Sequence, residues 1–228
     1  MGTKERKLRE RALREQQIIE KAKELFLAKG YEATTVDEIA EALEISKCAF
    51  YLHFASKEEL FFRIERVGLE AMYRLFTEST KKENTGLAKF GAIGMAYARF
   101  WKEYPELRKI ANEPVVSTKN PNPGPERRQA EELGAKVTSL NIEAVQQGIK
   151  DGSIRNDLDP MLMAAIIGYA TRGVLSGLED IQSALAQIGK KDADVLGTAI
   201  EMFGRALEPH PTPSTIKGTI ARGRGATR

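Results

Sequence analysis

Apolar side chains recur every three or four residues through most of this 228-residue chain, a spacing typical of helices with one buried face. The first stripe, formed by Ile18, Ala22, Leu25 and Phe26, predicts a helix over about 11–29 that ends at Gly30. Later stripes predict helices over about 36–43, 47–53, 57–81, 87–104, 105–111, 126–150, 160–178 and 193–207. No stretch alternates as a strand would, so we predict an all-α fold.

Two of these helices begin with a specific local signal. Thr35 is followed three residues later by Glu38, and Ser56 is followed at the same spacing by Glu59. In such a capping box the hydroxyl and the carboxylate each satisfy a free amide of the first helical turn. We therefore expect helices to begin directly after Thr35 and Ser56.

Residues 34–60 carry the arrangement that points to a function. Two helices are joined there by a tight turn, and the second helix is too short to be stable alone. This is the pattern of a helix-turn-helix, whose second helix lies in the major groove of DNA. At 100° per residue, Phe50 and Phe54 fall on one side of that helix and should pack on the preceding helices.

The opposite side of the short helix is the candidate surface for reading DNA. Cys48, Ala49 and Leu52 are small or apolar and could approach base edges such as thymine methyl groups. Tyr51 and His53 lie about 100° to either side, where each could reach a phosphate. Cys48 has a second interpretation as a redox-sensitive thiol, because a helix N-terminus lowers a thiol pKa. We prefer the interpretation of Cys48 as a small groove-facing residue.

Composition narrows the class of protein. The formal net charge of +3 says little about nucleic acid, but residues 1–14 hold six basic and two acidic side chains. Residues 208–228 are rich in proline, glycine and basic side chains and are expected to be a disordered basic tail. No apolar run approaches the ~20 residues of a membrane span, and the charged start lacks the apolar part of a secretory signal. We therefore expect a cytoplasmic protein.

Several chemistries find no support in the sequence. The single cysteine, Cys48, excludes an internal disulfide framework. No glycine-rich phosphate loop, nucleophile elbow or metal-ligand spacing is present. With two histidines and one cysteine, a metal site is not expected either. We expect no catalytic residues, no metal and no cofactor, and the chain is not expected to be an enzyme.

Residues 17–60 resemble the DNA-binding head of the tetracycline-repressor (TetR) family. The shared positions are Lys29, Gly30, Tyr31, Thr34, Thr35, Ile39, Ala40, Ser46, Lys47, Tyr51, His53, Phe54, Ser56, Lys57, Glu58, Glu59 and Leu60. The resemblance implies phosphate contacts from Thr35, Lys47, Tyr51, His53 and Lys57, and base readout by residues 47–49. The expected DNA-binding set is Thr35, Ser46, Lys47, Cys48, Ala49, Tyr51, His53 and Lys57.

The head also departs from the family pattern. Glu44 stands where the turn usually has glycine, so the turn is expected to differ slightly. Cys48 and Ala49 replace residues that often include a hydroxyl, which argues against hydrogen-bonded readout there. The helix at 36–43 is acidic and would repel phosphates if it faced them. We hypothesise that the basic residues before the first helix offset this by entering the minor groove.

The last two predicted long helices are expected to form a homodimer interface. Glycines inside a helix cost about 1 kcal/mol each relative to alanine, but they let two helices approach closely. In the resembled family the last two major helices form a four-helix bundle across a two-fold axis. The expected interface residues are Ile166, Gly173, Val174, Gly177, Ala199, Met202 and Phe203. The alternative is that these residues belong to the core of a single chain.

The resemblance further implies that the helices at 57–81, 87–104 and 126–150 surround a small apolar ligand. Aromatic and methionine side chains suit adaptable apolar pockets, although each is otherwise an ordinary core residue. The candidate wall residues are Met72, Phe76, Phe90, Met95, Tyr97, Phe100, Trp101, Met163, Ile167 and Tyr169.

Together these patterns predict a ligand-responsive transcriptional regulator that binds palindromic operator DNA as a homodimer. By resemblance it is expected to be a repressor that a small apolar effector releases. The expected parts are a DNA-binding domain over 1–57, a ligand-binding and dimerisation domain over 58–207, and the tail over 208–228. The alternative is an apolar-ligand binding protein whose degenerate head does not read DNA, which Glu44 and the acidic helix favour weakly.

Overall fold

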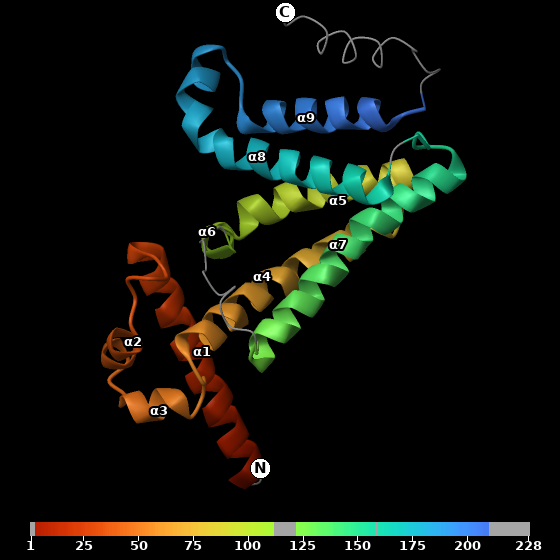
Figure 1. Ribbon diagram of the computed structural model, residues 1–228. Coiled ribbons are helices and arrows are strands. Elements are labelled where there is room, and N and C mark those ends of the chain that lie inside the picture. Colours follow the sequence, from red (N-terminus) through yellow and green to blue (C-terminus); the bar gives the residue numbers. More distant parts are fainter. Residues whose placement is uncertain (1–2, 112–121, 158, 210–228) are drawn as a thin grey trace, which may run out of the picture.

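The computed structural model describes residues 3–111, 122–157 and 159–209. Every regular element among these residues is an α-helix, which confirms the predicted fold class (Figure 1). The helices are α1 Thr3–Lys29, α2 Val36–Ala42, α3 Lys47–Tyr51, α4 Lys57–Thr80, α5 Gly86–Glu103, α6 Pro105–Ala111, α7 Pro125–Asp151, α8 Pro160–Gln187 and α9 Asp192–Leu207. The tail expected over 208–228 lies almost wholly outside the described residues.

The head and the body share one apolar core through α4. Figure 1 shows α1, α2 and α3 at one end of the molecule, and α4 and α7 run from there toward α8 and α9. Ile18 and Phe50 of the head belong to the same buried cluster as Ile64 of α4, Phe90 of α5 and Val145 of α7. The domain boundary expected between residues 57 and 58 therefore falls in the first turn of a helix that both parts share.

Helix α1 begins at Thr3, well before the expected start near residue 11. Its first turns consist mainly of charged residues with good helix propensity, and neither glycine nor proline interrupts them. The ion pairs Arg6–Glu10, at 3.5 Å, and Arg11–Glu15, at 3.0 Å, each link side chains four residues apart. The basic residues that were expected to precede the first helix are therefore part of it.

One predicted capping box is complete and the other is half formed. Thr35 Oγ1 accepts a hydrogen bond from the Glu38 amide at 3.2 Å, and the Glu38 carboxylate accepts one from the Thr35 amide at 2.8 Å. Ser56 Oγ accepts from the Glu59 amide at 3.1 Å. The buried Glu59 carboxylate instead accepts from the Glu126 amide of α7 at 3.0 Å. The N-cap of α7 is Gly124, which has no side chain of its own to satisfy that amide.

The start of α5 is pressed against the end of α7. A Cβ atom on Gly86 would lie 1.9 Å from the Gly148 nitrogen, so no other side chain fits there without movement. The Gly86 amide donates to Asp151 Oδ2 at 2.8 Å, and the Leu87 amide donates to Ser153 Oγ at 3.1 Å. Hydrogen bonds to its carboxylate, with that from the Ser153 side chain first among them, lower the pKa of Asp151. The end of one helix thus caps the beginning of another.

Helix α8 leaves much of its apolar surface uncovered. Ile166 is 65% exposed and Tyr169 is 75% exposed, and Met202 of the neighbouring α9 is exposed as well. Among the described residues, the stretch Pro160–Leu178 has the length and apolar composition of a membrane span, and 22% of it is buried. The expectation that no run approaches that length is therefore corrected for α8. Length and composition are weak indications of a span, and an apolar exposed helix is equally what a subunit interface needs.

Candidate nucleic-acid interface and ligand cavity

The turn before α3 keeps a left-handed residue although it lacks glycine. Among the non-glycine residues that the structure describes, Glu44 alone has a positive φ, of 53°. A side chain in this conformation costs on the order of 1 kcal/mol, which the surrounding helices must offset. Ser46 then caps α3, because its Oγ accepts from the Ala49 amide at 3.1 Å. Glu44 therefore occupies the glycine conformation rather than forcing a different turn.

Helix α3 presents a mixed polar and apolar face to solvent. Phe50 and Phe54 are buried, as the helical spacing predicts. Lys47, Cys48, Tyr51 and Leu52 are exposed, and Leu52 reaches 72%. Ala49 is half-buried, so it contributes less to this face than the sequence suggests. The exposed side chains offer one cation, one hydroxyl and a small or apolar centre, a combination suited to phosphates at the rim and base edges between them.

Two lysines offset part of the acidity of α2. Lys47 Nζ lies 2.9 Å from Asp37 Oδ2, and Lys29 hydrogen-bonds to Glu38. The hydrogen bond from Lys29, followed by those from Thr35, lowers the pKa of Glu38 to about 2. An exposed ion pair such as Lys47–Asp37 contributes about 0–1 kcal/mol, so Lys47 can exchange its partner for a phosphate at little cost.

Lys57 faces the interior of the head. Its Nζ donates to the carbonyl oxygens of Tyr31, at 2.7 Å, and Thr34, at 2.8 Å, and lies 4.2 Å from the Tyr31 ring centre. Burial lowers the pKa of Lys57, and burial also raises the pKa of Tyr31 to about 12. The ammonium therefore ties α4 to the loop after α1. Sequence spacing could not show this, because the carbonyl groups come from a distant loop.

His53 also turns away from solvent. Its side chain is 14% exposed, and Nδ1 lies 3.5 Å from Glu15 Oε1 of α1. Glu15 Oε1 also accepts from Arg11 Nε at 3.0 Å. Thr35 and Ser46, by contrast, are exposed at the starts of α2 and α3. Of the predicted DNA contacts, Thr35, Ser46, Lys47, Cys48 and Tyr51 lie on the outer surface. Lys57 instead binds backbone carbonyls of the head, and the largely buried His53 faces α1.

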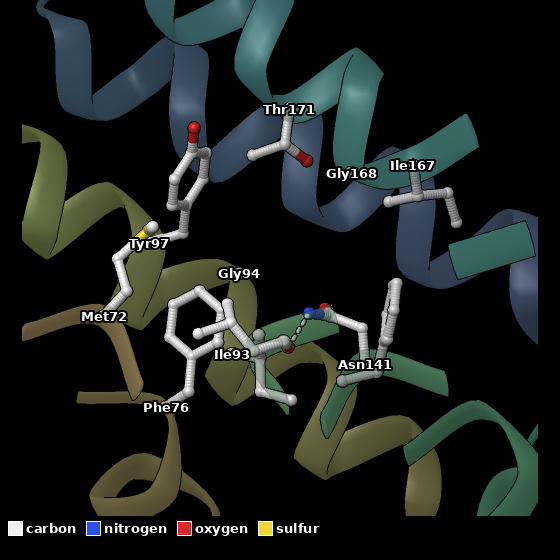
Figure 2. A pocket seen from close by; sticks show the side chains of 11 residues that line it. Met72, Phe76, Ile93, Gly94, Tyr97, Asn141, Ile167, Gly168 and Thr171 are labelled. Atoms are coloured by element: carbon white, nitrogen blue, oxygen red, sulfur yellow. Dashed lines mark hydrogen bonds between the residues drawn. The ribbon is translucent and has the colours of Figure 1, made fainter. Parts of the chain in front are cut away.

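A second candidate site is an apolar cavity of about 210 Å³ in the body. Figure 2 shows side chains from α4, α5, α7 and α8 converging on it. Five predicted wall residues line it, namely Met72, Phe76, Phe90, Tyr97 and Ile167. The sequence interpretation missed Ile93, Gly94, Val137, Asn141, Gly168 and Thr171. Val137 and Asn141 are four residues apart and so lie on one face of α7, and this spacing could have predicted that α7 lines the cavity.

Other predicted wall residues lie elsewhere. Met95 is 57% exposed, because one residue along a helix turns it about 100° from the lining residue Gly94. Met163 is buried in the core, and Tyr169 lies in an outer groove between α7 and α8. Phe100 and Trp101 line an adjoining cavity of about 160 Å³. Met72 and Tyr97 line both cavities.

Few polar groups face the cavity. Asn141 Nδ2 donates to the Val137 carbonyl oxygen at 3.3 Å, the hydrogen bond drawn in Figure 2. Burial, which outweighs the opposing charge of Arg172, raises the pKa of Tyr97. The phenol is therefore protonated at neutral pH and able to donate a hydrogen bond. The cavity is larger than the ~150 Å³ apolar cavity known to admit benzene, so a small apolar molecule fits it.

The predicted interface residues lie on α8 and α9. Ile166, Gly173 and Met202 are exposed, while Val174, Gly177, Ala199 and Phe203 are half-buried. A Cβ atom on Gly173 or Gly177 would meet nothing within 4 Å in the single chain. The exposed surface therefore combines apolar side chains with positions where another helix could approach closely.

Sequence comparison relates the chain to bacterial regulatory proteins. Residues 18–64 match the family model described as bacterial regulatory proteins, tetR family. The HTH-type transcriptional regulator TcmR of Streptomyces glaucescens is 54% identical over 59 residues, which are 26% of this chain and 25% of TcmR. The HTH-type transcriptional repressor KstR2 of Mycobacterium tuberculosis is 29% identical over 163 residues, 68% of this chain and 76% of KstR2.

Solved structures share the fold along most of the chain. PfmR of Thermus thermophilus, a TetR family transcriptional regulator, superimposes with a TM-score of 0.61 at 23% identity, over 86% of this chain and 96% of PfmR. KstR2 of Mycobacterium tuberculosis, described as a ketosteroid transcriptional regulator, superimposes with a TM-score of 0.63 at 21% identity, over 86% of this chain and 96% of KstR2. FadR of Bacillus subtilis, solved with stearoyl-CoA, gives 0.63 at 17% identity over 82% of this chain and 96% of FadR.

Proposed function

The chain belongs to the tetR family of bacterial regulatory proteins and is a ligand-responsive transcriptional regulator, and from this premise we propose how it acts. As a homodimer it binds a palindromic operator with one α3 in each half-site, as a repressor. A small apolar effector in the cavity between α4, α5, α7 and α8 releases it. The observation that carries the proposal is the exposed face of α3 on a capped three-helix head.

On α3, we assign readout of bases to the centre of the exposed face and phosphate contact to its margins. Cys48 and Leu52 provide small or apolar contacts, with Ala49 beside them. Lys47, Tyr51 and Thr35 supply groups that bind phosphate oxygens. Lys57 acts indirectly, because its hydrogen bonds hold α4 against the loop after α1, and His53 is turned away from the surface that α3 presents.

Release follows from coupling between the cavity and the head. Helix α4 contributes Met72 and Phe76 to the cavity and Lys57 to the head, so a ligand that shifts α4 also shifts α3. The contact of Glu59 with the first turn of α7 ties both helices together near the head. A ligand that prefers a head separation unsuited to the operator weakens DNA binding by its differential affinity alone.

The effector class rests on the cavity and on the relatives. An apolar lining with a few hydrogen-bonding groups selects a small, mostly apolar molecule. The ketosteroid regulator KstR2 and the stearoyl-CoA complex of FadR carry names that also involve bulky apolar groups. A cytoplasmic location, where operator DNA is found, is part of the proposal.

The test is selection of genomic DNA by the purified full chain at about 0.15 M salt. The retained fragments are then sequenced and compared. The proposal expects one palindromic motif, with half-sites about 10 base pairs or a multiple apart. Recovery of unselected DNA, or of none, would contradict it and favour a ligand-binding protein whose head does not read sequence.

A further inference from the structure

The first turns of α1 carry a basic face that the proposed operator contact does not use. At 100° per residue, Lys4, Lys7, Arg11 and Arg14 fall within a sector of about 80°. Among the described residues, no acidic side chain pairs with Lys4, Lys7 or Arg14, whereas Arg11 pairs with Glu15. The face therefore offers cations that are free to meet a polyanion.

This face points to the same side as the interior face of α1. Ile18, Ala22 and Leu25 fall in the same angular sector one to three turns further along, and Ile18 and Ala22 are fully buried. Arg6 and Arg9 fall on the opposite side of the helix. The side of α1 that packs against the other head helices is therefore continued by basic side chains in residues 4–14.

The position of α3 fixes where the basic face lies. His53, just after α3, meets α1 at Glu15, with 3.5 Å between Nδ1 and Oε1. Beyond that contact, residues 3–14 continue the helix for about 18 Å at 1.5 Å per residue. Figure 1 shows this end of α1 reaching past α3 on the side of the head opposite the body. It therefore lies beside any duplex that α3 enters.

The helical shape of residues 3–14 excludes the minor-groove contact that an extended chain could make. An α-helix is about 10–12 Å wide with its side chains, whereas the minor groove is about 6 Å wide. The helical segment cannot enter that groove while it stays folded. Its length exceeds the width of about 12 Å of the major groove, so it can span to the phosphates beyond the groove edge.

We propose that residues 4–14 form a second DNA-contacting surface, whose basic face lies against phosphates flanking each half-site. This inference rests on the proposed operator binding. The contact adds affinity and salt dependence but carries no sequence information, because the phosphates are the same in every sequence. It extends the footprint of the dimer outward from both half-sites.

The test compares two charge-matched double variants of the full chain. K4Q/K7Q removes two cations from the basic face, and R6Q/R9Q removes two from the opposite face. All four side chains are exposed, and glutamine keeps helix propensity, so circular dichroism should be unchanged for both. The probes are duplexes of the genomically selected motif with flanks of 2 or 12 base pairs on each side.

We expect the wild type to bind the long-flank duplex more tightly than the short one. K4Q/K7Q should lose that advantage, bind the long duplex at least about tenfold more weakly at ~0.15 M salt, and show a log–log salt slope shallower by about 3 to 4 for four lost contacts per dimer. R6Q/R9Q should stay within about twofold of the wild type on both duplexes.

Four results would overturn the inference. Equal losses in both variants would mean a general effect of net charge, and no loss in K4Q/K7Q would mean that the face is not in contact. Dependence on A·T content in the flanks, with an unchanged salt slope, would mean that the segment unfolds to read the minor groove. Failure of the wild type on every duplex would overturn the proposed operator binding and this surface with it.

Discussion

At the scale of single residues, charged side chains of the head serve its internal structure as much as its surface. Lys57 satisfies backbone carbonyls of the loop after α1, and Glu38 caps α2 while it pairs with Lys29. Because the folded-state pKa of Glu38, about 2, lies below its ordinary value of 4.5, its charge stabilises the head above pH 4.5. That contribution is lost as the pH falls toward 2.

Glu38→Gln should show this directly. Glutamine can still complete the capping box, so the variant removes the charge and keeps the hydrogen-bonding shape. We expect the wild type to melt at a higher temperature than E38Q at pH 7, and the difference to shrink as the pH falls below about 4.5. Thermal melts at a series of pH values measure it. Glu41→Gln, on an exposed residue of the same helix, is the control and should show no such trend.

At the scale of elements, the body depends on close helix contacts that only glycine permits. The start of α5 meets the end of α7 where Gly86 faces Gly148, and α7 is itself capped by Glu59 of α4. A Cβ atom on Gly124 would lie 2.1 Å from Glu59 Oε1, so this second junction also requires a glycine. Helix α7 is thus held close to α4 at its start and close to α5 at its end.

Gly86→Ala should lower the free energy of unfolding by about 1–3 kcal/mol, because the added methyl group overlaps the α7 backbone. Gly91→Ala in the same helix is the matched control. A Cβ atom there meets nothing within 4 Å, so alanine should raise stability by about 0.5–1 kcal/mol through helix propensity. Urea unfolding of the two variants measures both effects, and equal losses would contradict the close-contact explanation.

At the scale of the whole molecule, α8 and α9 leave an apolar surface that a second copy of the chain can cover. Ile166→Glu should raise the dimer dissociation constant by at least about 100-fold, because a buried unpaired charge costs several kcal/mol. Met95→Glu is the control, since Met95 is exposed on α5 away from this surface. Sedimentation measures the oligomeric state. A dimeric I166E would place the interface elsewhere.

The cavity makes a second whole-molecule prediction, that a larger side chain at a lining position prevents a small apolar molecule from binding there. Gly94 lines the cavity and Gly91, one turn earlier, does not, although a Cβ atom meets nothing within 4 Å at either. With benzene as the probe, the wild type and Gly91→Leu should gain thermal stability and Gly94→Leu should not. All three should bind the selected operator duplex. A retained benzene shift in G94L would contradict the assignment of the site.

The sequence by itself determined what depends on neighbours within one or two turns. Periodicity predicted the helices, Thr35 and Ser56 marked helix starts, and the spacing of Phe50 and Phe54 identified the buried side of α3. These signals are local, because a cap or a helical stripe needs only the residues beside it. The resemblance of residues 17–60 to a known head rests on the same local pattern.

Tertiary structure alone decided which partners distant residues find. It turned His53 toward Glu15 and gave the Glu59 carboxylate to α7 rather than to its own helix. It also separated Tyr97, which faces the cavity, from Met95, which faces solvent. These outcomes depend on how each helix is rotated and how closely it crosses its neighbours, and packing across the whole body sets both. No spacing along the chain contains that information.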